Sequence, residues 1–144
     1  MEPKAGRHHI KVTNHRKRED FAEFMKWLIE ERYSDATKVR IVLDNLNTHF
    51  EKSFYETFTK QEAKKLLKKI QFVYTPKHAS WLNMAEIEIN IMDKECLDRN
   101  IGSKKELERE LEIWCGQNNK EKRKINWSFT RQKVDKKLSK HYVS

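Results

Sequence analysis

Glycine, proline and cysteine are scarce in this chain, and each scarcity excludes a class of protein. Only three Gly and two Pro occur in 144 residues, which excludes a linker-rich chain and favours regular elements joined by short connections. The two cysteines, Cys96 and Cys115, lack the closely spaced Cys or His partners of a zinc site. We therefore expect both to be reduced residues of a helical core.

Long apolar runs are also lacking. No stretch of 18 apolar residues occurs, so the sequence predicts no membrane-spanning helix. The first residues are polar and basic, which is not the pattern of a secretion signal. An intracellular, cytoplasmic protein is expected.

Acidic residues are outnumbered by basic ones. The chain has 31 Lys and Arg against 22 Asp and Glu, a formal net charge of +9 and a pI of about 9.5. This balance favours a polyanionic partner, most simply nucleic acid, with an acidic membrane surface as the weaker alternative. Solubility alone would explain the same charge.

Three short segments have strand patterns. Residues 8–14 alternate, with Ile10 and Val12 on one face. Residues 38–44 form a β-branched apolar run that is typical of a strand buried on both faces. Residues 70–74 form a third strand, which Pro76 ends.

Helical patterns lie between and after these strands. Residues 19–32 carry an amphipathic stripe, and helical character returns near Phe50. Capping boxes begin at Thr59 and Ser103, a further helix opens near Ser80 or Asn83, and residues 130–141 form a basic helix. Strands that alternate with helices predict an α/β protein whose mixed or parallel sheet is flanked by helices.

Asp44 directly follows the strand at 38–44. In such sheets ligands bind beyond the carboxyl ends of the strands. A carboxylate on a rigid strand end suits a hard divalent cation, which prefers oxygen ligands. A turn residue at the end of a strand would have the same appearance.

Glu86 is the second candidate carboxylate. Residues 83–86 (NMAE) fit a capping box, with Glu86 stabilising the start of its helix. Alternatively, Glu86 points across the sheet towards Asp44. By pattern alone the capping role is favoured, and Glu88, on the opposite side of the helix, is a weaker candidate.

Basic residues near these acids are candidates for DNA contact. Lys77 and His78 follow the strand at 70–74 and could position phosphate, and His49 follows the earlier strand. Towards the C-terminus further cations fit either phosphate contact or a solvated face: Lys122, Arg123, Lys124 and Arg131.

Residues 43–49 (LDNLNTH), 74–86 (YTPKHASWLNMAE) and 127–130 (WSFT) resemble the catalytic region of mariner-like DDE superfamily transposases of insertion sequences. The resemblance extends from Pro3 to the C-terminus, and its two central motifs are long and specific. It implies a ribonuclease H-like fold and DNA as substrate, at transposon ends and target. Three carboxylates would bind two Mg²⁺ or Mn²⁺ ions for an in-line phosphoryl transfer.

By this resemblance Asp44 is the second acid of the triad and Glu86 is the third. The resemblance also implies a nucleoid-associated protein, acting as a homodimer or with an upstream transposase fragment. The first acid is the exception, because neither Asp20 nor Asp35 matches its position. The family's first strands and its helix-turn-helix region likewise have no counterpart here.

We therefore expect residues 1–144 to be one partial catalytic domain, the C-terminal portion of a transposase. The strand at 38–44 would keep an unpaired edge, metal binding would weaken, and the isolated chain would have little or no strand-transfer activity. A non-catalytic basic DNA-binding module and a decayed relic are the alternatives.

Overall fold

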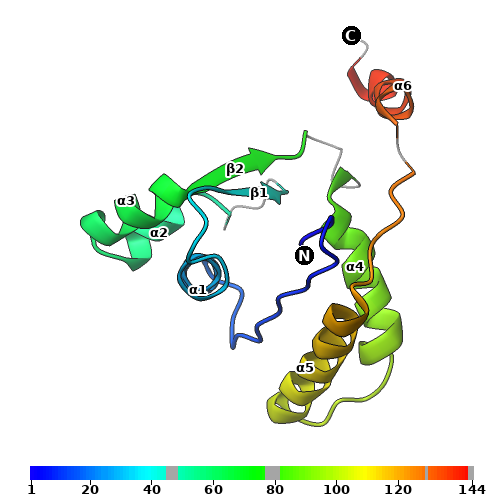
Figure 1. The fold of residues 1–144 in the computed structure, drawn as a ribbon, viewed down its shortest axis with the longest axis horizontal. Helices are drawn as coiled ribbons and strands as arrows, with labels where there is room; N and C mark the ends of the chain where they lie inside the picture. The colour runs from blue at the N-terminus through cyan, green and yellow to red at the C-terminus, as the bar shows by residue number, and fades with distance from the viewer. Residues whose placement is uncertain (45–48, 77–81, 129, 143–144) are drawn as a thin grey trace. The chain divides into compact units, whose positions relative to one another are not determined.

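The computed structural model describes residues 1–44, 49–76, 82–128 and 130–142, which form two compact units (Figure 1). The sheet unit is Thr13–Lys77, and the helical unit joins Met1–Val12 to His78–Ser144. Over the described ranges there are six α-helices and one two-stranded parallel sheet. This confirms the prediction of a mixed α/β protein, while the ribonuclease H-like fold stays a prediction.

The sheet unit contains two parallel strands and three helices. Its elements are α1 (Arg18–Trp27), a π-helical turn η1 (Leu28–Arg32), β1 (Val39–Leu43), α2 (Lys52–Thr57), α3 (Lys60–Lys69) and β2 (Ile70–Tyr74). The strands pair in register from Val39 opposite Ile70 to Leu43 opposite Tyr74. Both were predicted within a residue or two. Thr59 caps α3 by accepting a hydrogen bond from the Glu62 amide, as its capping box predicted.

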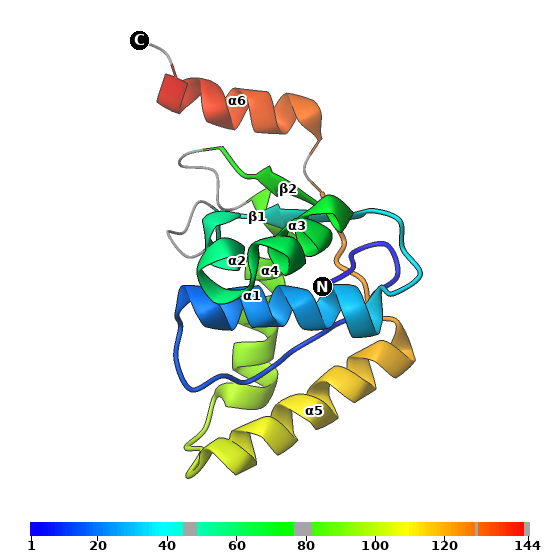
Figure 2. The same cartoon turned by 90° about the vertical axis from the view of Figure 1, so that its left-hand side faces the viewer.

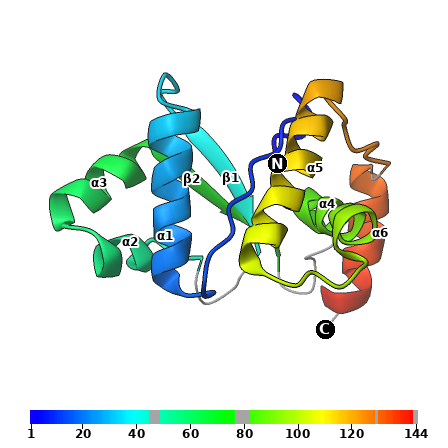
Figure 3. The ribbon, with the colours of Figure 1, turned by 90° about the horizontal axis from the view of Figure 1, so that it is seen from below.

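Aromatic rings make the core of the sheet unit. Phe54 is fully buried and its ring centroid lies 6.2 Å from that of Phe21 and 6.1 Å from that of Phe72. Since Phe21, Phe54 and Phe72 come from α1, α2 and β2, this cluster joins the helices to the sheet. Figures 2 and 3 show α1 lying against the two strands with α2 beside it.

The prediction that residues 38–44 are buried on both faces is wrong. Exposure alternates along β1 and β2, and Val42 and Val73 are 49% and 38% exposed. The aromatic core meets only one face of the two strands, so alternate side chains remain in solvent. In the described part of the chain, β1 has a strand partner on one edge only.

The helical unit contains three α-helices and a π-helical turn. They are α4 (Met84–Met92), η3 (Asp93–Leu97), α5 (Lys104–Glu121) and α6 (Arg131–Tyr142). Asn83 and Ser103 cap α4 and α5 through their side-chain oxygens, which accept from the amides of Ala85 and Glu106. No helix in the described ranges has the length and apolarity needed to cross a membrane.

The prediction of a strand over residues 8–14 is wrong. The backbone of His8 is instead bonded to a helix: its amide donates to Asn119 Oδ1 (2.6 Å) and its carbonyl accepts from Asn119 Nδ2 (3.0 Å). The Asn119 side chain of α5 therefore provides the backbone hydrogen bonds that a neighbouring strand would otherwise make. The expected apolar face is real, because Ile10 and Val12 pack against a cluster built on Cys96, Leu111 and Trp114.

Both cysteines behave as expected of core residues. Cys96 is buried in this cluster, Cys115 packs against it, and neither forms a disulfide. Burial raises the pKa of the Cys96 thiol, with the neighbouring Glu110 carboxylate adding to the shift. A thiol held in its neutral form is a packing group rather than a nucleophile.

Gly6 allows the N-terminal turn to touch the end of α5. Its φ is 62°, and a Cβ at this position would lie 2.4 Å from the carbonyl oxygen of Lys122. Lys122 ends α5 in the left-handed conformation, with φ 52° and ψ 42°. Two backbone segments approach here so closely that only glycine fits at position 6.

Phe54→Ala should lower the free energy of unfolding by about 3–5 kcal/mol, because it empties the centre of the aromatic core. Urea denaturation followed by circular dichroism measures the change. Tyr55→Ala is the matched control, since Tyr55 is the next residue of α2 and is 46% exposed; its loss should stay below about 1 kcal/mol. Equal losses would contradict the assignment of Phe54 to the core.

Candidate active site

Asp44 lies at the carboxyl end of the parallel pair. It follows Leu43, which is buried and whose carbonyl accepts a hydrogen bond from the Thr75 amide (2.8 Å). The Asp44 side chain is 30% exposed, and its Oδ1 lies 2.9 Å from His49 Nδ1. The backbone that carries Asp44 is therefore fixed by the strand pair. The second carboxylate oxygen, Oδ2, has no partner in the described structure. This confirms the predicted position of Asp44 at the strand end.

His49 is held from two sides while it bonds Asp44. Its ring centroid lies 4.8 Å from that of Phe21, and its backbone carbonyl accepts a hydrogen bond from the Tyr74 hydroxyl (2.8 Å). Burial raises the pKa of Tyr74, with the Glu51 carboxylate adding to the shift, so the hydroxyl remains a donor. Because a carboxylate only accepts, Nδ1 of His49 carries the proton of the bond to Asp44.

Glu86 is the third residue of α4 and is half-buried. Asn83 accepts from the Ala85 amide, but the Glu86 carboxylate makes no return bond to the N-cap. It has no hydrogen bond or ion pair with any residue in the described ranges. The carboxylate is thus not used for capping, the role that the pattern favoured, and its oxygens are available to a ligand.

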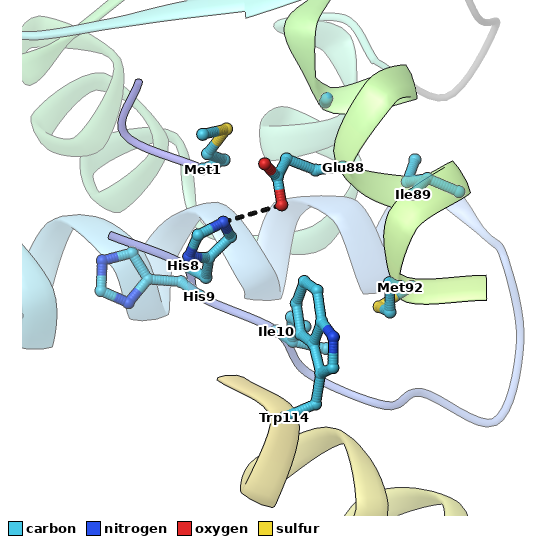
Figure 4. Close-up of a pocket in the computed structure, with 9 residues that line it drawn as sticks. Met1, His8, His9, Ile10, Glu88, Ile89, Met92 and Trp114 are labelled. Carbon is cyan, nitrogen blue, oxygen red and sulfur yellow. Dashed lines mark hydrogen bonds and ion pairs between the residues drawn. The ribbon is translucent and has the colours of Figure 1, made fainter. Parts of the chain in front are cut away.

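Glu88 is buried and paired with His8. Its Oε2 lies 2.9 Å from His8 Nε2, and the two side chains are 8% and 3% exposed (Figure 4). The Trp114 ring meets the His8 ring edge-on at 5.5 Å. Two helical residues span about 200° of rotation, so burial of Glu88 turns Glu86 to the opposite side of α4. Glu88 is therefore a structural residue.

A cavity of about 160 Å³ lies beside this pair. Figure 4 shows that most of its lining is apolar, contributed by Ile10, Ile89, Met92 and Trp114. Of the polar residues at its wall, His8 and Glu88 already bind each other, and His9 is the third. Neither the pair nor the cavity was found from sequence, because their partners are 80 residues apart.

The two candidate acids belong to different units, Asp44 to the sheet unit and Glu86 to the helical unit. Their convergence stays a prediction. Across the residues that the structure describes, no three His, Cys, Asp or Glu side chains gather as a metal site. What fits a divalent cation is the chemistry of the donors: Asp44 Oδ2 and the Glu86 carboxylate are hard oxygens that no group in the described ranges engages.

The predicted DNA-contacting cations are either outside the described residues, exposed, or engaged by an acid. Lys77 and His78 lie outside the described residues. Lys122 and Lys124 are exposed, and no described acid pairs with them. Arg131 is 96% exposed, with only a distant contact to Asp135 at 4.0 Å.

Arg123 is engaged within the helical unit. Its two terminal nitrogens each lie 2.9 Å from an oxygen of Glu95, and Trp114 Nε1 donates to Glu95 at 2.8 Å. Hydrogen bonds from Arg123, and secondarily from Trp114, lower the pKa of Glu95. The bond to Glu95 in turn raises the pKa of Arg123. Phosphate would have to compete with Glu95 for this guanidinium.

The Glu95 pairing predicts a loss of stability in acid. A carboxyl with a lowered pKa in the folded chain stabilises it above the unfolded pKa, and the effect disappears as pH falls through the folded pKa. The free energy of unfolding should fall from about pH 4.5 downwards. Glu95→Gln should abolish the contribution of this pairing to that fall, which is on the order of 1 kcal/mol for an exposed pair. Urea midpoints at pH 7 and pH 3 test this, with Glu112→Gln, an exposed residue of α5, as control. Identical pH profiles for Glu95→Gln and the unaltered chain would refute it.

Comparison with known proteins supports the resemblance in its coarser form. The family model described as DDE superfamily endonuclease matches residues 1–108, a range that includes both Asp44 and Glu86. No curated protein and no solved structure matches the chain. Since the match spans most of the 144 residues, the chain belongs to the DDE superfamily endonucleases, a family of nucleases that act on DNA and generally use divalent metal ions.

Proposed function

We propose that this chain supplies two metal-binding carboxylates, Asp44 and Glu86, to a site that cleaves and transfers DNA strands during transposition. The mariner-like insertion-sequence transposases are the group it fits best. The observation that carries the proposal is the Asp44 carboxylate, which stands at the carboxyl end of a parallel pair. One of its oxygens is held by His49, and no other described residue engages the second. Membership of the DDE superfamily supports it.

Bound Mg²⁺ or Mn²⁺ would stabilise the charge that develops on the phosphate and activate the attacking hydroxyl or water. The protein's part is to hold oxygen donors in place. Asp44 offers Oδ2 while His49 fixes Oδ1, and hydrogen-bonded carboxylate ligands are a usual feature of metal sites. Glu86 stands in the first turn of α4, where the helix dipole stabilises a negative charge.

We propose that a third oxygen donor comes from another polypeptide segment, because neither Asp20 nor Asp35 stands at the position of the family's first acid. Two carboxylates supply two of the three negative ligand charges of the full triad. A divalent cation is therefore attracted less strongly. We therefore propose one partial catalytic domain, with weak metal binding and little strand cleavage by these 144 residues alone. An upstream fragment or a second copy of the chain are the candidate donors.

Lysines and arginines supply the contacts to DNA in this proposal. Lys122, Lys124 and Arg131 are exposed cations suited to phosphate, and Lys77 and His78 follow β2 in sequence. Arg123 joins them only when phosphate displaces Glu95. Such contacts position DNA without reading its sequence, and their strength falls steeply with salt.

Asp44→Asn should abolish the broadening of the His49 NMR signals by Mn²⁺, because it removes the charged donor next to His49. Glu86→Gln should weaken the broadening, and Asp35→Asn, an exposed acid of the same unit, is the control for lost charge. Affinity for duplex DNA without metal should stay equal or rise slightly. Broadening that persists in Asp44→Asn would favour a non-catalytic basic DNA-binding module.

Nicking of duplex DNA by the chain alone, with Mn²⁺, should stay close to background. Robust nicking that Asp44→Ala abolishes would overturn the proposed need for a third donor.

His49→Ala should lower Mn²⁺ affinity by about tenfold, the lower end of the effect of losing a ligand's supporting hydrogen bond. His49→Gln, which can still donate to Asp44, should recover part of the loss. Mn²⁺ titration followed by NMR measures both, and DNA affinity without metal should not change. Equal metal affinities for the two variants would show that His49 does not orient Asp44.

A further inference from the structure

The outward half of α3 is a lysine surface. Ala63 and Leu66 are buried against the core, and about 100° of rotation per residue places the remaining positions towards solvent. Four of those positions are exposed lysines, which we call the α3 lysine face: Lys60, Lys64, Lys65 and Lys68. In the described structure none of these four ammonium groups forms an ion pair.

No acid of α3 neutralises this face. Glu62 is the single carboxylate of the helix, and it is bound to the ammonium of Lys26 from α1. That hydrogen bond is the main cause of the raised pKa of Lys26. The α3 lysine face therefore keeps its full positive charge.

The end of α3 does not require the face for stability. Cations favour a helix C-terminus, but two other lysines already make hydrogen bonds to carbonyls in this region. Lys38 donates to the Lys68 carbonyl at the end of α3 (2.9 Å), and Lys69 of α3 donates to the Ser34 carbonyl, which follows η1 (2.7 Å). Capping of α3 thus accounts for Lys38, and a bond to the segment after η1 accounts for Lys69, whereas the exposed lysines have no such role.

The first half of α5 shows what a merely solvated helix looks like in this chain. There Lys104, Lys105 and Arg109 alternate with glutamates, and they form pairs such as Lys104 with Glu108 at 3.6 Å and Arg109 with Glu110 at 3.2 Å. Mixed signs of this kind are typical of a surface that only meets water. The α3 lysine face has one sign.

We infer that the α3 lysine face contacts the phosphate backbone of duplex DNA. Lys64 and Lys68 lie one turn apart, about 6 Å along the helix axis, so their cations can follow one strand. Flexible lysine stems bind phosphate as point charges and carry no sequence information. The inference rests on the proposed function, and it adds a DNA surface to the unit that carries Asp44.

The salt dependence of DNA binding tests this. Fluorescence anisotropy with a labelled duplex, without divalent metal, gives the affinity between 50 and 200 mM KCl. Replacing Lys64, Lys65 and Lys68 together by Gln should reduce the slope of log K against log salt by about 2 to 3, since each lost phosphate contact accounts for about 0.9. Gln preserves helix propensity, which circular dichroism verifies.

The matched control removes the same charge from α5 through Lys104→Gln, Lys105→Gln and Arg109→Gln, and should leave the slope unchanged. Equal slope changes in the two triple variants would mean that only net charge matters, and would overturn the inference. An unchanged slope in the α3 variant would overturn it too. Failure of the unaltered chain to bind duplex DNA at 50 mM KCl would instead refute the proposed function.

Discussion

The parallel pairing of β1 with β2 is the constraint on which the candidate site depends. Its register places Leu43 opposite Tyr74, so the residue after β1 emerges beside Tyr74. Tyr74 bonds the backbone of His49, and the ring of His49 bonds Asp44. The aromatic core beneath the sheet keeps this chain of contacts in place, because Phe21 packs on both Phe54 and His49.

Two histidine–carboxylate pairs serve opposite purposes in the molecule. Asp44 and His49 are both partly exposed, and their bond leaves one oxygen accessible. Glu88 and His8 are buried, and each uses the other to offset the loss of water. Accessibility, rather than the type of residue, therefore separates a candidate ligand from a structural pair. It is also why Glu86, two residues from Glu88, is the better candidate ligand on α4.

Local patterns predicted the elements well and the long-range partners poorly. Alternation and β-branching located β1 and β2, and Thr59, Asn83 and Ser103 marked helix starts, because these signals act over a few residues. Residues 8–14 alternate too, yet their partner is Asn119 on a helix 111 residues from His8. The exposed outer face of β1 and the pairing of His49 with Asp44 likewise depend on neighbours that periodicity does not encode.

The helical unit is discontinuous in sequence, and this affects the order in which the chain folds during synthesis. Met1–Val12 is made before the sheet unit but finds its partners only when α4 and α5 have been made. The sheet unit lies between these two parts in sequence, is one continuous segment and has its own core. It can therefore fold before Met1–Val12 packs against α5. Until Gly6 reaches Lys122, Met1–Val12 stays accessible to proteases and chaperones, so this segment gains protection only after α5 has been made.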